Sequence, residues 1–475
     1  MMKITKRFLA LGLCLVLAAG VLSGCRKKTE GGETGSVPTL IWWQIGSQPA
    51  DLAAAVAKMN EYTEQKIGVK VDIRYAGWDV WEEKIKSIVN TGEYYDIMFT
   101  NTNKYTSHAS LGAFADLTEL LNTAAPDLKA FVPDELWKAV KIQGKIYAVP
   151  TYKDSSSTQY FVWDKAMVEK YDVDYENLKT LKDLDPVLRR IKAGEEAATG
   201  KKCYPFPLAK EGFNGIFMEY DNYVKYDDPK AQVLNTYERP EIVENLTILH
   251  KWYTDGIINP DASTLGEPPK YRVCYSAQGF PGADAVWSKT NGYTTVSTPY
   301  AGPIYSTGSI LGSVNAISAN SKHKEAALKY LQLANTDPVL RNMLAYGIEG
   351  QHWKDNGDGT ITKLTDTWTA PLYSQATFFT VKPESPNPPN QWKLLEEQNE
   401  KATPSVILGF TLDESDIEAE ITNVESVKKK YEAELLTGVK DPATFLPQFN
   451  KELRAAGLDT VLAETQKQVN AFLGK

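Results

Sequence analysis

The 475-residue sequence contains little of the chemistry from which metal centres and disulfide-rich scaffolds are built. Four cysteines and four histidines make a zinc cluster hard to assemble and exclude a disulfide-dense scaffold. Cys203 and Cys274 can form one disulfide or remain two buried thiols. Beyond the first 24 residues, no apolar run reaches the length of about 18 residues that indicates a membrane-spanning helix. With 60 acidic and 52 basic residues the formal net charge is −8, so we expect no nucleic-acid partner.

Motifs of the common catalytic sites are missing as well. The sequence has no G-x-S-x-G elbow, P-loop or H-E-x-x-H pair. His108, His250, His323 and His352 are scattered, which is typical of structural or surface groups. A glycosidase needs only two carboxylates about 5–10 Å apart, so the acidic residues leave that reaction open without favouring it. We therefore predict no catalytic residue, no cofactor and no metal site.

The segment Asp355–Thr360 (DNGDGT) has some likeness to a calcium-binding loop. An EF-hand loop needs the pattern D-x-[DN]-x-[DN]-G and a glutamate at its twelfth position. Here glycines break the spacing, and the twelfth position counted from Asp355 is Asp366. We expect a hairpin turn between Trp353 and Ile361, although the pattern alone leaves calcium binding undecided.

The N-terminus has the features of an export signal. A basic segment precedes the apolar run Phe8–Leu22, which is short for a membrane span and fits a secretory signal. The run ends in Leu22-Ser23-Gly24-Cys25, which resembles the lipobox of bacterial lipoproteins. Residues 1–24 are then a lipoprotein signal peptide, Cys25 carries the lipid, and residues 25–38 form a flexible tether. This places the protein on the extracellular face of the bacterial cytoplasmic membrane.

The first hundred residues of the body alternate between strand and helix patterns. Apolar residues recur with period 2 in the expected strands and at i, i+4 and i+7 in the expected helices. In order these are strand Thr39–Ile45, helix Ala50–Lys66, strand Val69–Tyr75, helix Val80–Asn90 and strand Asp96–Phe99. This alternation predicts a parallel sheet with crossover helices. Ligands bind beyond the carboxyl ends of such strands, here at Gln44–Ser47, Ala76–Asp79 and Thr100–Asn103.

The rest of the chain is more irregular. Amphipathic helices are expected at Lys179–Ile191 and Glu241–Asp255, and charged ones at Glu414–Thr437 and Pro442–Lys475. The apolar, glycine-rich stretch Ala301–Ser318 is typical of a strand-like connection between two bodies.

Several segments, in this order along the chain, resemble family 1 extracellular solute-binding proteins, the sugar receptors of ABC importers. They are Leu111–Leu117, Gly144–Pro150, Tyr160–Lys165, Ser321–Leu331, Tyr346–Gly350 and Gly409–Asp413. The resemblance implies an α/β fold with two discontinuous lobes joined by a hinge, the type II periplasmic-binding-protein-like fold. Lobe I would comprise residues 39–149 plus 305–345, and lobe II residues 150–304 plus 346–475.

Aromatic residues are plentiful, with 25 Tyr, 15 Phe and 11 Trp. A sugar ring presents an apolar C–H face and a belt of hydroxyls, so aromatic rings beside polar side chains suit it. Candidate ligand-binding residues at the strand ends, the lobe crossings and polar-aromatic clusters are Trp43, Gln44, Trp78, Asn101, Tyr105, Tyr152, Asp154, Tyr220, Asp221, Trp287, Tyr346 and Glu349.

These observations favour a lipid-anchored, monomeric receptor that closes around a carbohydrate, most simply an oligosaccharide. It would deliver the sugar to ABC permease subunits on separate chains, since this chain has no ATPase motif. A lipid-anchored enzyme acting on glycans, a receptor for a peptide or another polar solute, and a sensory receptor remain alternatives. The sequence leaves open the identity, length and linkage of the sugar.

Overall fold

The computed structural model describes residues 37–475, so the expected signal peptide, Cys25 and all but the end of the tether lie outside the described residues. The five expected elements at the start of the body are confirmed with shifts of one or two residues. They are β1 (Thr39–Ile45), α1 (Leu52–Ile67), β2 (Lys70–Ala76), α2 (Trp81–Thr91) and β3 (Ile97–Thr100). Strand β1 pairs in parallel with β2 and β3, as the alternation predicts.

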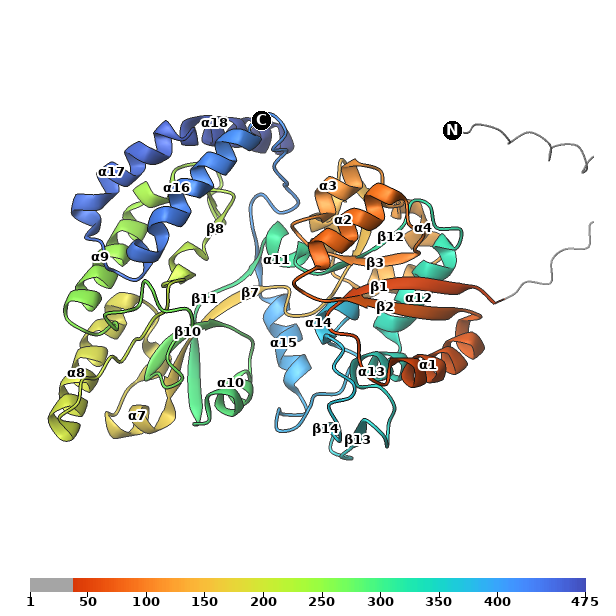
Figure 1. Ribbon diagram of the computed structural model, residues 1–475, viewed down its shortest axis with the longest axis horizontal. Coiled ribbons are helices and arrows are strands. Elements are labelled where there is room, and N and C mark those ends of the chain that lie inside the picture. The colour runs from red at the N-terminus through yellow and green to blue at the C-terminus, as the bar shows by residue number, and fades with distance from the viewer. Residues whose placement is uncertain (1–36) are drawn as a thin grey trace, which may run out of the picture. The chain divides into compact units, whose positions relative to one another are not determined.

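Lobe I is built around a five-stranded sheet with the strand order β2-β1-β3-β12-β6 (Figure 1). Its strand β12 (Val314–Ile317) returns from late in the sequence and runs antiparallel to β3 and to β6 (Ala148–Pro150). The other elements between β3 and β6 are α3 (Tyr105–Ser110), α4 (Thr118–Thr123), α5 (Pro126–Phe131), α6 (Asp134–Ala139), β4 (Lys141–Ile142) and β5 (Lys145–Ile146).

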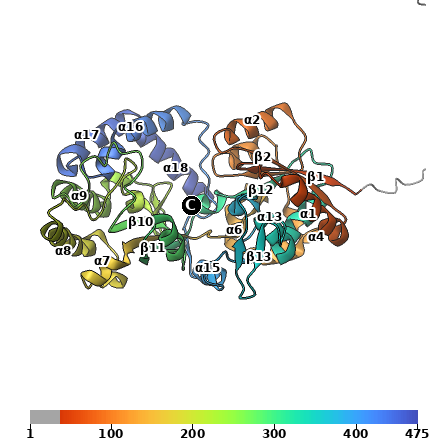
Figure 2. The same cartoon turned by 60° about the horizontal axis from the view of Figure 1, so that its bottom comes forward.

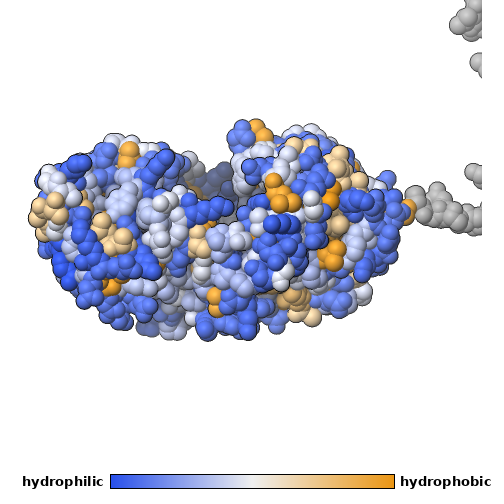
Figure 3. All heavy atoms as spheres, turned by 90° about the horizontal axis from the view of Figure 1, so that it is seen from below, coloured by the Kyte–Doolittle hydropathy of each residue, from blue (hydrophilic) through white to orange (hydrophobic). Residues whose placement is uncertain are grey.

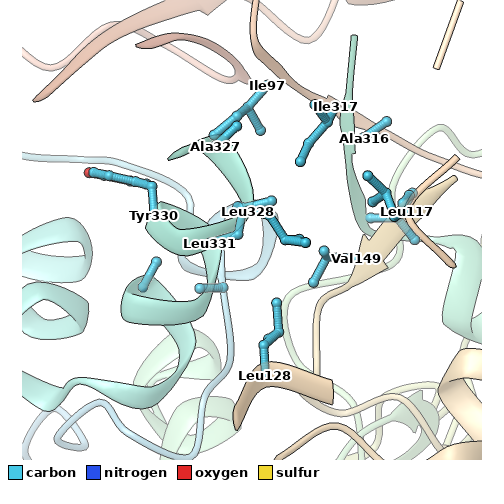
Figure 4. Packing of buried hydrophobic residues seen from close by; sticks show 14 of the residues in the cluster. Ile97, Leu117, Leu128, Val149, Ala316, Ile317, Ala327, Leu328, Tyr330 and Leu331 are labelled. Carbon is cyan, nitrogen blue, oxygen red and sulfur yellow. The ribbon is translucent and has the colours of Figure 1, made fainter. Parts of the chain in front are cut away.

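Helix α12 (Lys324–Thr336) closes the core of lobe I. Its side chains Leu328 and Leu331 are fully buried and lie against Leu128 of α5 and Val149 of β6 (Figure 4). Burying a leucine side chain contributes about 1.5–3 kcal/mol, so this late helix stabilises a sheet that forms mostly from the first 150 residues. This helix includes most of Ser321–Leu331, one of the segments that carry the resemblance.

Lobe II contains a four-stranded sheet with the order β10-β7-β11-β15. Its strands are β7 (Ser157–Asp164), β10 (Cys274–Gln278), β11 (Thr295–Tyr305) and β15 (Thr403–Pro404), and β7 runs antiparallel to β10 and β11. A small hairpin is formed by β8 (Tyr220–Asp221) and β9 (Val224–Lys225). The helices of this lobe are α7 (Lys165–Lys170), α8 (Leu181–Thr199), α9 (Pro240–Thr254), α10 (Asp284–Asn291), α16 (Glu418–Leu436), α17 (Pro442–Ala455) and α18 (Leu458–Phe472).

The C-terminal segment differs from the single helix expected over Pro442–Lys475. It breaks into α17 and α18 at Gly457, whose φ of 107° is a conformation that residues with a Cβ rarely adopt. A Cβ there would also lie only 2.6 Å from Cγ of Glu420 on α16. The glycine therefore lets the chain turn closely over α16.

Three chain crossings connect the lobes. The first joins β6 to β7, the second runs from β11 through α11 (Thr307–Leu311) to β12, and the third contains α15 (Gln391–Glu400) and leads to β15. Both Figures 1 and 2 show α15 between the lobes. The two-lobe α/β architecture expected from the resemblance is thus present within residues 38–475, which form one compact unit.

The third crossing comes later in the chain than the expected boundary at residue 346. Helix α13 (Pro338–Tyr346) is followed by the hairpin β13 (Trp353–Asp355) and β14 (Ile361–Lys363) and by α14 (Leu372–Gln375). Trp368 and Ala376 belong to the core of lobe I. The segment stays on lobe I because these apolar side chains are buried there.

Among residues 37–475, no helix is long and apolar enough to cross a membrane.

Candidate functional site

The carboxyl ends of β1, β2 and β3 form the rim of lobe I that points toward lobe II (Figure 1). The space-filling view shows the surface hollowed between the lobes (Figure 3). In open α/β sheets this edge is where ligands bind. The rim is therefore the lobe I side of the candidate site.

An aromatic platform stands on this rim. Trp78, in the loop between β2 and α2, is 55% exposed. Its ring stacks on the half-buried ring of Tyr373 from α14, with centroids 5.7 Å apart and an interplanar angle of 30°. Phe99 of β3 supports Tyr373 edge-on at 6.2 Å. A large exposed aromatic ring held in place by a second ring is a ready surface for the apolar face of a ligand.

Buried polar contacts fix the position of Tyr373. The guanidinium of Arg341 is fully buried and donates to the carbonyls of Leu372, at 2.9 Å, and Thr377, at 2.6 Å. The hydroxyl of Ser313 donates to the carbonyl of Tyr373 at 2.7 Å. Burial lowers the pKa of Arg341 to about 9. Helix α14 has only four residues, so these contacts hold the platform more firmly than the helix itself does.

Gly46, at the end of β1, leaves room under the platform. Its φ of 121° disfavours any other residue, and a Cβ would lie 3.0 Å from Cγ of Pro371, just before α14. The close approach lets the segment carrying Tyr373 lie directly on the strand end.

Polar groups follow β3 at the same rim. The half-buried Asn101 accepts a hydrogen bond from the amide of Asn103 at 3.1 Å. Asn103 donates to Glu82 of α2 at 3.1 Å. Thr102 donates at 3.3 Å to the carbonyl of Gly308 in the second crossing. These side chains lie where lobe I meets the hinge and can bond to hydroxyl groups.

Asp221 is the corresponding polar group of lobe II. It ends β8 and lies near Ser405, which directly follows β15, and near Thr307 of the second crossing. Its Oδ1 accepts from Asn222 at 3.1 Å, whereas its Oδ2 is buried without a hydrogen-bond partner among the described residues. Burial raises the pKa of Asp221 to about 6, although Ser405 and Thr307 favour its charged form. The Ser405 hydroxyl and the Thr307 amide lie close enough to favour the charge but do not reach Oδ2 at hydrogen-bond distance, so a ligand hydroxyl that donates to Oδ2 would complete its pairing.

A family model for bacterial extracellular solute-binding proteins matches residues 57–348, more than half of the chain. The chain belongs to this family. A second model, for a domain of unknown function, matches residues 406–474, the segment that contains α16, α17 and α18. The sequence-based resemblance is therefore confirmed for the family and for the two-lobe α/β fold.

Matches from Streptococcus pneumoniae cover nearly the whole length of this solute-binding protein. A carbohydrate ABC transporter substrate-binding protein is 29% identical, covering 98% of this chain and 96% of the relative. A crystal structure of the N-glycan transport solute-binding protein NgtS superimposes with a TM-score of 0.82 at 26% identity, covering 92% and 99% of the two chains. NgtS in complex with Man1GlcNAc gives 0.70 at 26% identity, and in complex with Man5GlcNAc 0.66 at 27%.

Two of the twelve candidate residues of this solute-binding protein have partners that occupy much of their surface. The hydroxyl of the half-buried Tyr220 hydrogen-bonds to Glu241, and the guanidinium of Arg239 lies 5.6 Å from its ring centroid. The half-buried Trp287 packs edge-on against Tyr160 at 5.8 Å, in a small cluster of lobe II. Each keeps only part of its surface free.

Five other candidates are buried in the structure. Trp43 is 8% exposed and is covered by Lys84, whose Nζ lies 4.5 Å from the ring centroid. Gln44 is fully buried; it donates to Asn315 at 3.3 Å and accepts from Ser374 at 2.7 Å. Both lie inside β1 rather than beyond it, because that strand continues to Ile45.

Tyr105, Tyr152 and Tyr346 are buried as well. Tyr105 donates to the carbonyl of Val140 at 2.5 Å, and Tyr346 to the carbonyl of Lys382 at 2.7 Å. The ring of Tyr152 lies 4.3 Å from that of Phe379, centroid to centroid. Tyr105 and Tyr152 belong to the core of lobe I, and Tyr346 packs in a small cluster with Trp353 and Ile361 of the β13–β14 hairpin.

The last two candidates lie near the surface. The half-buried Asp154 forms an ion pair with Lys153 at 2.6 Å in the first crossing. Glu349 is exposed beside the β13–β14 hairpin, and no described contact connects it with Trp78 or Asp221.

Other expectations concern metal and cysteine. Asp355–Thr360 is the expected hairpin turn, because Asp355 accepts from the amide of Gly357 at 3.0 Å and Asp358 from that of Thr360 at 2.9 Å. Within residues 37–475, no group of three or more His, Cys, Asp or Glu side chains could hold a metal ion. Cys203 and Cys274 are free thiols.

Tyr373 is the main residue that sequence reasoning missed. It lies in a short irregular segment without a strand or helix pattern, and its neighbour Trp78 is far away in the sequence. An alternation of apolar and polar residues could not have found it.

Proposed function

We propose that this solute-binding protein captures an oligosaccharide between its lobes and delivers it to the permease of an ABC importer. The observation that carries the proposal is the exposed Trp78–Tyr373 platform at the rim of lobe I. One face of a sugar ring rests on Trp78, and Asn101 and Asp221 bond to its hydroxyls. A hydrogen bond to a charged group such as Asp221 contributes roughly 1.5–3 kcal/mol.

The relatives support a carbohydrate as the ligand. One is named as a carbohydrate substrate-binding protein, and NgtS is described with two oligosaccharides of mannose and N-acetylglucosamine. These two sugars are therefore the first ligands to test.

Closure of the lobes is the binding movement in this proposal. The lobes are joined only by three crossings, and Asp221 lies beside the second of them. Contacts from both lobes can form together only in the closed state, so the ligand stabilises that state. The higher TM-score with one NgtS structure than with its two sugar complexes supports a difference in lobe placement of this kind.

The sugar is bound without being changed. The relatives named above are binding proteins of transporters, and the described site combines aromatic and hydroxyl-binding groups rather than a pair of catalytic carboxylates. In the proposed arrangement the monomer is held outside the cell by a lipid on Cys25, and the permease and ATPase are separate chains.

Calorimetric titration of the chain starting at Arg26 with Man1GlcNAc, Man5GlcNAc and a wider glycan panel tests the proposal. We expect saturable binding, recovery of intact sugar, and a large loss of affinity in Trp78→Ala. Leu111→Ala is the matched control, because it truncates another exposed apolar side chain of lobe I, one that is 70% exposed. Cleavage of the sugar, or equal binding by both variants, would contradict the proposal. Mass spectrometry of the mature N-terminal peptide tests acylation at Cys25.

A further inference from the structure

A basic surface surrounds the point at which the compact body begins. A cavity of about 580 Å³ is lined by Pro38, by the loop between α1 and β2, and by the start of α12. Pro38 directly precedes β1, and Figures 1 and 2 show the amino end of β1 on the side of lobe I away from lobe II. The cavity is therefore at the opposite end of the strands from the sugar-binding rim.

Lysines dominate the charge of this surface. Lys322, Lys324 and Lys329 line the cavity, against a single acidic residue, Glu325. Lys322 and Lys329 are exposed, and Lys324 donates to the carbonyl of Ser321 at 2.8 Å. None of the three lysines has a carboxylate within salt-bridge distance among residues 37–475. This concentration of positive charge contrasts with the net charge of −8 of the whole chain.

We propose that this basic surface rests on the anionic lipid headgroups of the membrane that carries the anchor. The proposal depends on the lipid anchor proposed at Cys25. The chain between Cys25 and Pro38 can span at most about 45 Å when fully extended. Since Pro38 itself lines the cavity, the tether joins the body at this surface, and these lysines lie beside the point of attachment. Lobe I then stands with the amino ends of β1 and β2 toward the membrane and its rim open to sugars in solution.

The attraction is electrostatic and short-ranged. Each lysine near an anionic membrane strengthens binding about fivefold, so the three together strengthen it about 100-fold. The effect decays over a Debye length of about 8 Å at physiological salt. It is therefore strong only if the lysines lie at the surface of the bilayer.

Vesicle flotation with the chain starting at Val37, which lacks the basic residues Arg26, Lys27 and Lys28 of the tether, measures the surface by itself, since residues 38–475 form a compact unit with its own cores. We expect binding to vesicles of phosphatidylglycerol and phosphatidylcholine, and weak binding to phosphatidylcholine alone. The variant Lys322→Gln, Lys324→Gln, Lys329→Gln should bind about 100-fold more weakly. The control variant Lys210→Gln, Lys251→Gln, Lys429→Gln removes equal charge from exposed positions of lobe II and should bind as the parent does.

Equal losses in both variants would overturn the proposal, because they would show a general charge effect. Equal binding to neutral vesicles would overturn it too. These failures leave the sugar receptor intact, since sugar titration of the first variant should match the parent. Absence of acylation at Cys25 in cells would instead overturn the anchored orientation, whatever the vesicles show.

Discussion

Replacement of Asp221 by asparagine should stabilise the protein at pH 7.5 while weakening sugar binding. Burial raises the pKa of this carboxyl to about 6, from 3.8 in an unperturbed aspartate. The folded protein therefore binds a proton between pH 4 and 6 that the unfolded chain does not bind. Ionised Asp221 thus lowers stability above pH 6, and this cost disappears as the pH falls below about 4.

The size of this destabilisation follows from the pKa shift of Asp221. Two pKa units correspond to about 3 kcal/mol of destabilisation at neutral pH. Asparagine removes the charge but adds an N–H next to the Thr307 amide, which costs about 1 kcal/mol if unpaired. We expect a net gain of about 2 kcal/mol at pH 7.5 and a smaller difference at pH 4. Sugar affinity should fall, because the amide replaces a charged acceptor.

Urea unfolding at both pH values and calorimetric titration of the sugar at pH 7.5 measure these effects. Asp227→Asn is the control, because Asp227 is an exposed carboxylate just beyond the same hairpin and should change neither quantity. A variant that is less stable than the parent at pH 7.5, or a difference that does not depend on pH, would refute the reasoning about burial. A gain in stability with unchanged sugar affinity would refute only the proposed contact between Asp221 and the sugar.

Three further predictions concern the platform. Trp78→Ala should raise the Kd for sugar about 30-fold, as expected for a stacked tryptophan at a binding hot spot. Its unfolding free energy should change by less than about 1 kcal/mol, because the side chain is exposed. An unchanged Kd in calorimetry would show that the platform is not part of the binding site. Arg341→Ala should lower the unfolding free energy by about 3 kcal/mol or more, since it leaves carbonyls of the α14 segment unpaired; a melting temperature equal to that of the parent would show that these bonds do not matter. Gly46→Ala should lower the unfolding free energy by about 1–3 kcal/mol, because the backbone at this position has a positive φ and the added Cβ would contact Pro371. It should weaken sugar binding as well. An unchanged affinity would show that the close approach at Gly46 does not position the platform.

Local periodicity was sufficient for the first three strands of the lobe I sheet and for the two helices between them. The alternation in Thr39–Ile45 and in the next strand reflects side chains that point to opposite faces, and Gly68 and Gly92 end the helices that follow. These signals involve neighbours within a few residues, so they need no knowledge of the fold. The same periodicity could not show that α12 closes the core of lobe I or that Trp368 packs there.

The same distinction between local pattern and tertiary contact applies to the candidate site. The sequence by itself determined that the strand ends form a rim and that Trp78 stands on it, because a loop after a parallel strand reaches that edge of the sheet. Only the tertiary structure decided which other residues can meet a ligand. It placed Tyr373 beneath Trp78, left Asp221 with an unpaired acceptor at the hinge, and buried Trp43, Gln44 and Tyr105. Burial and pairing depend on segments distant in sequence, which no local pattern records.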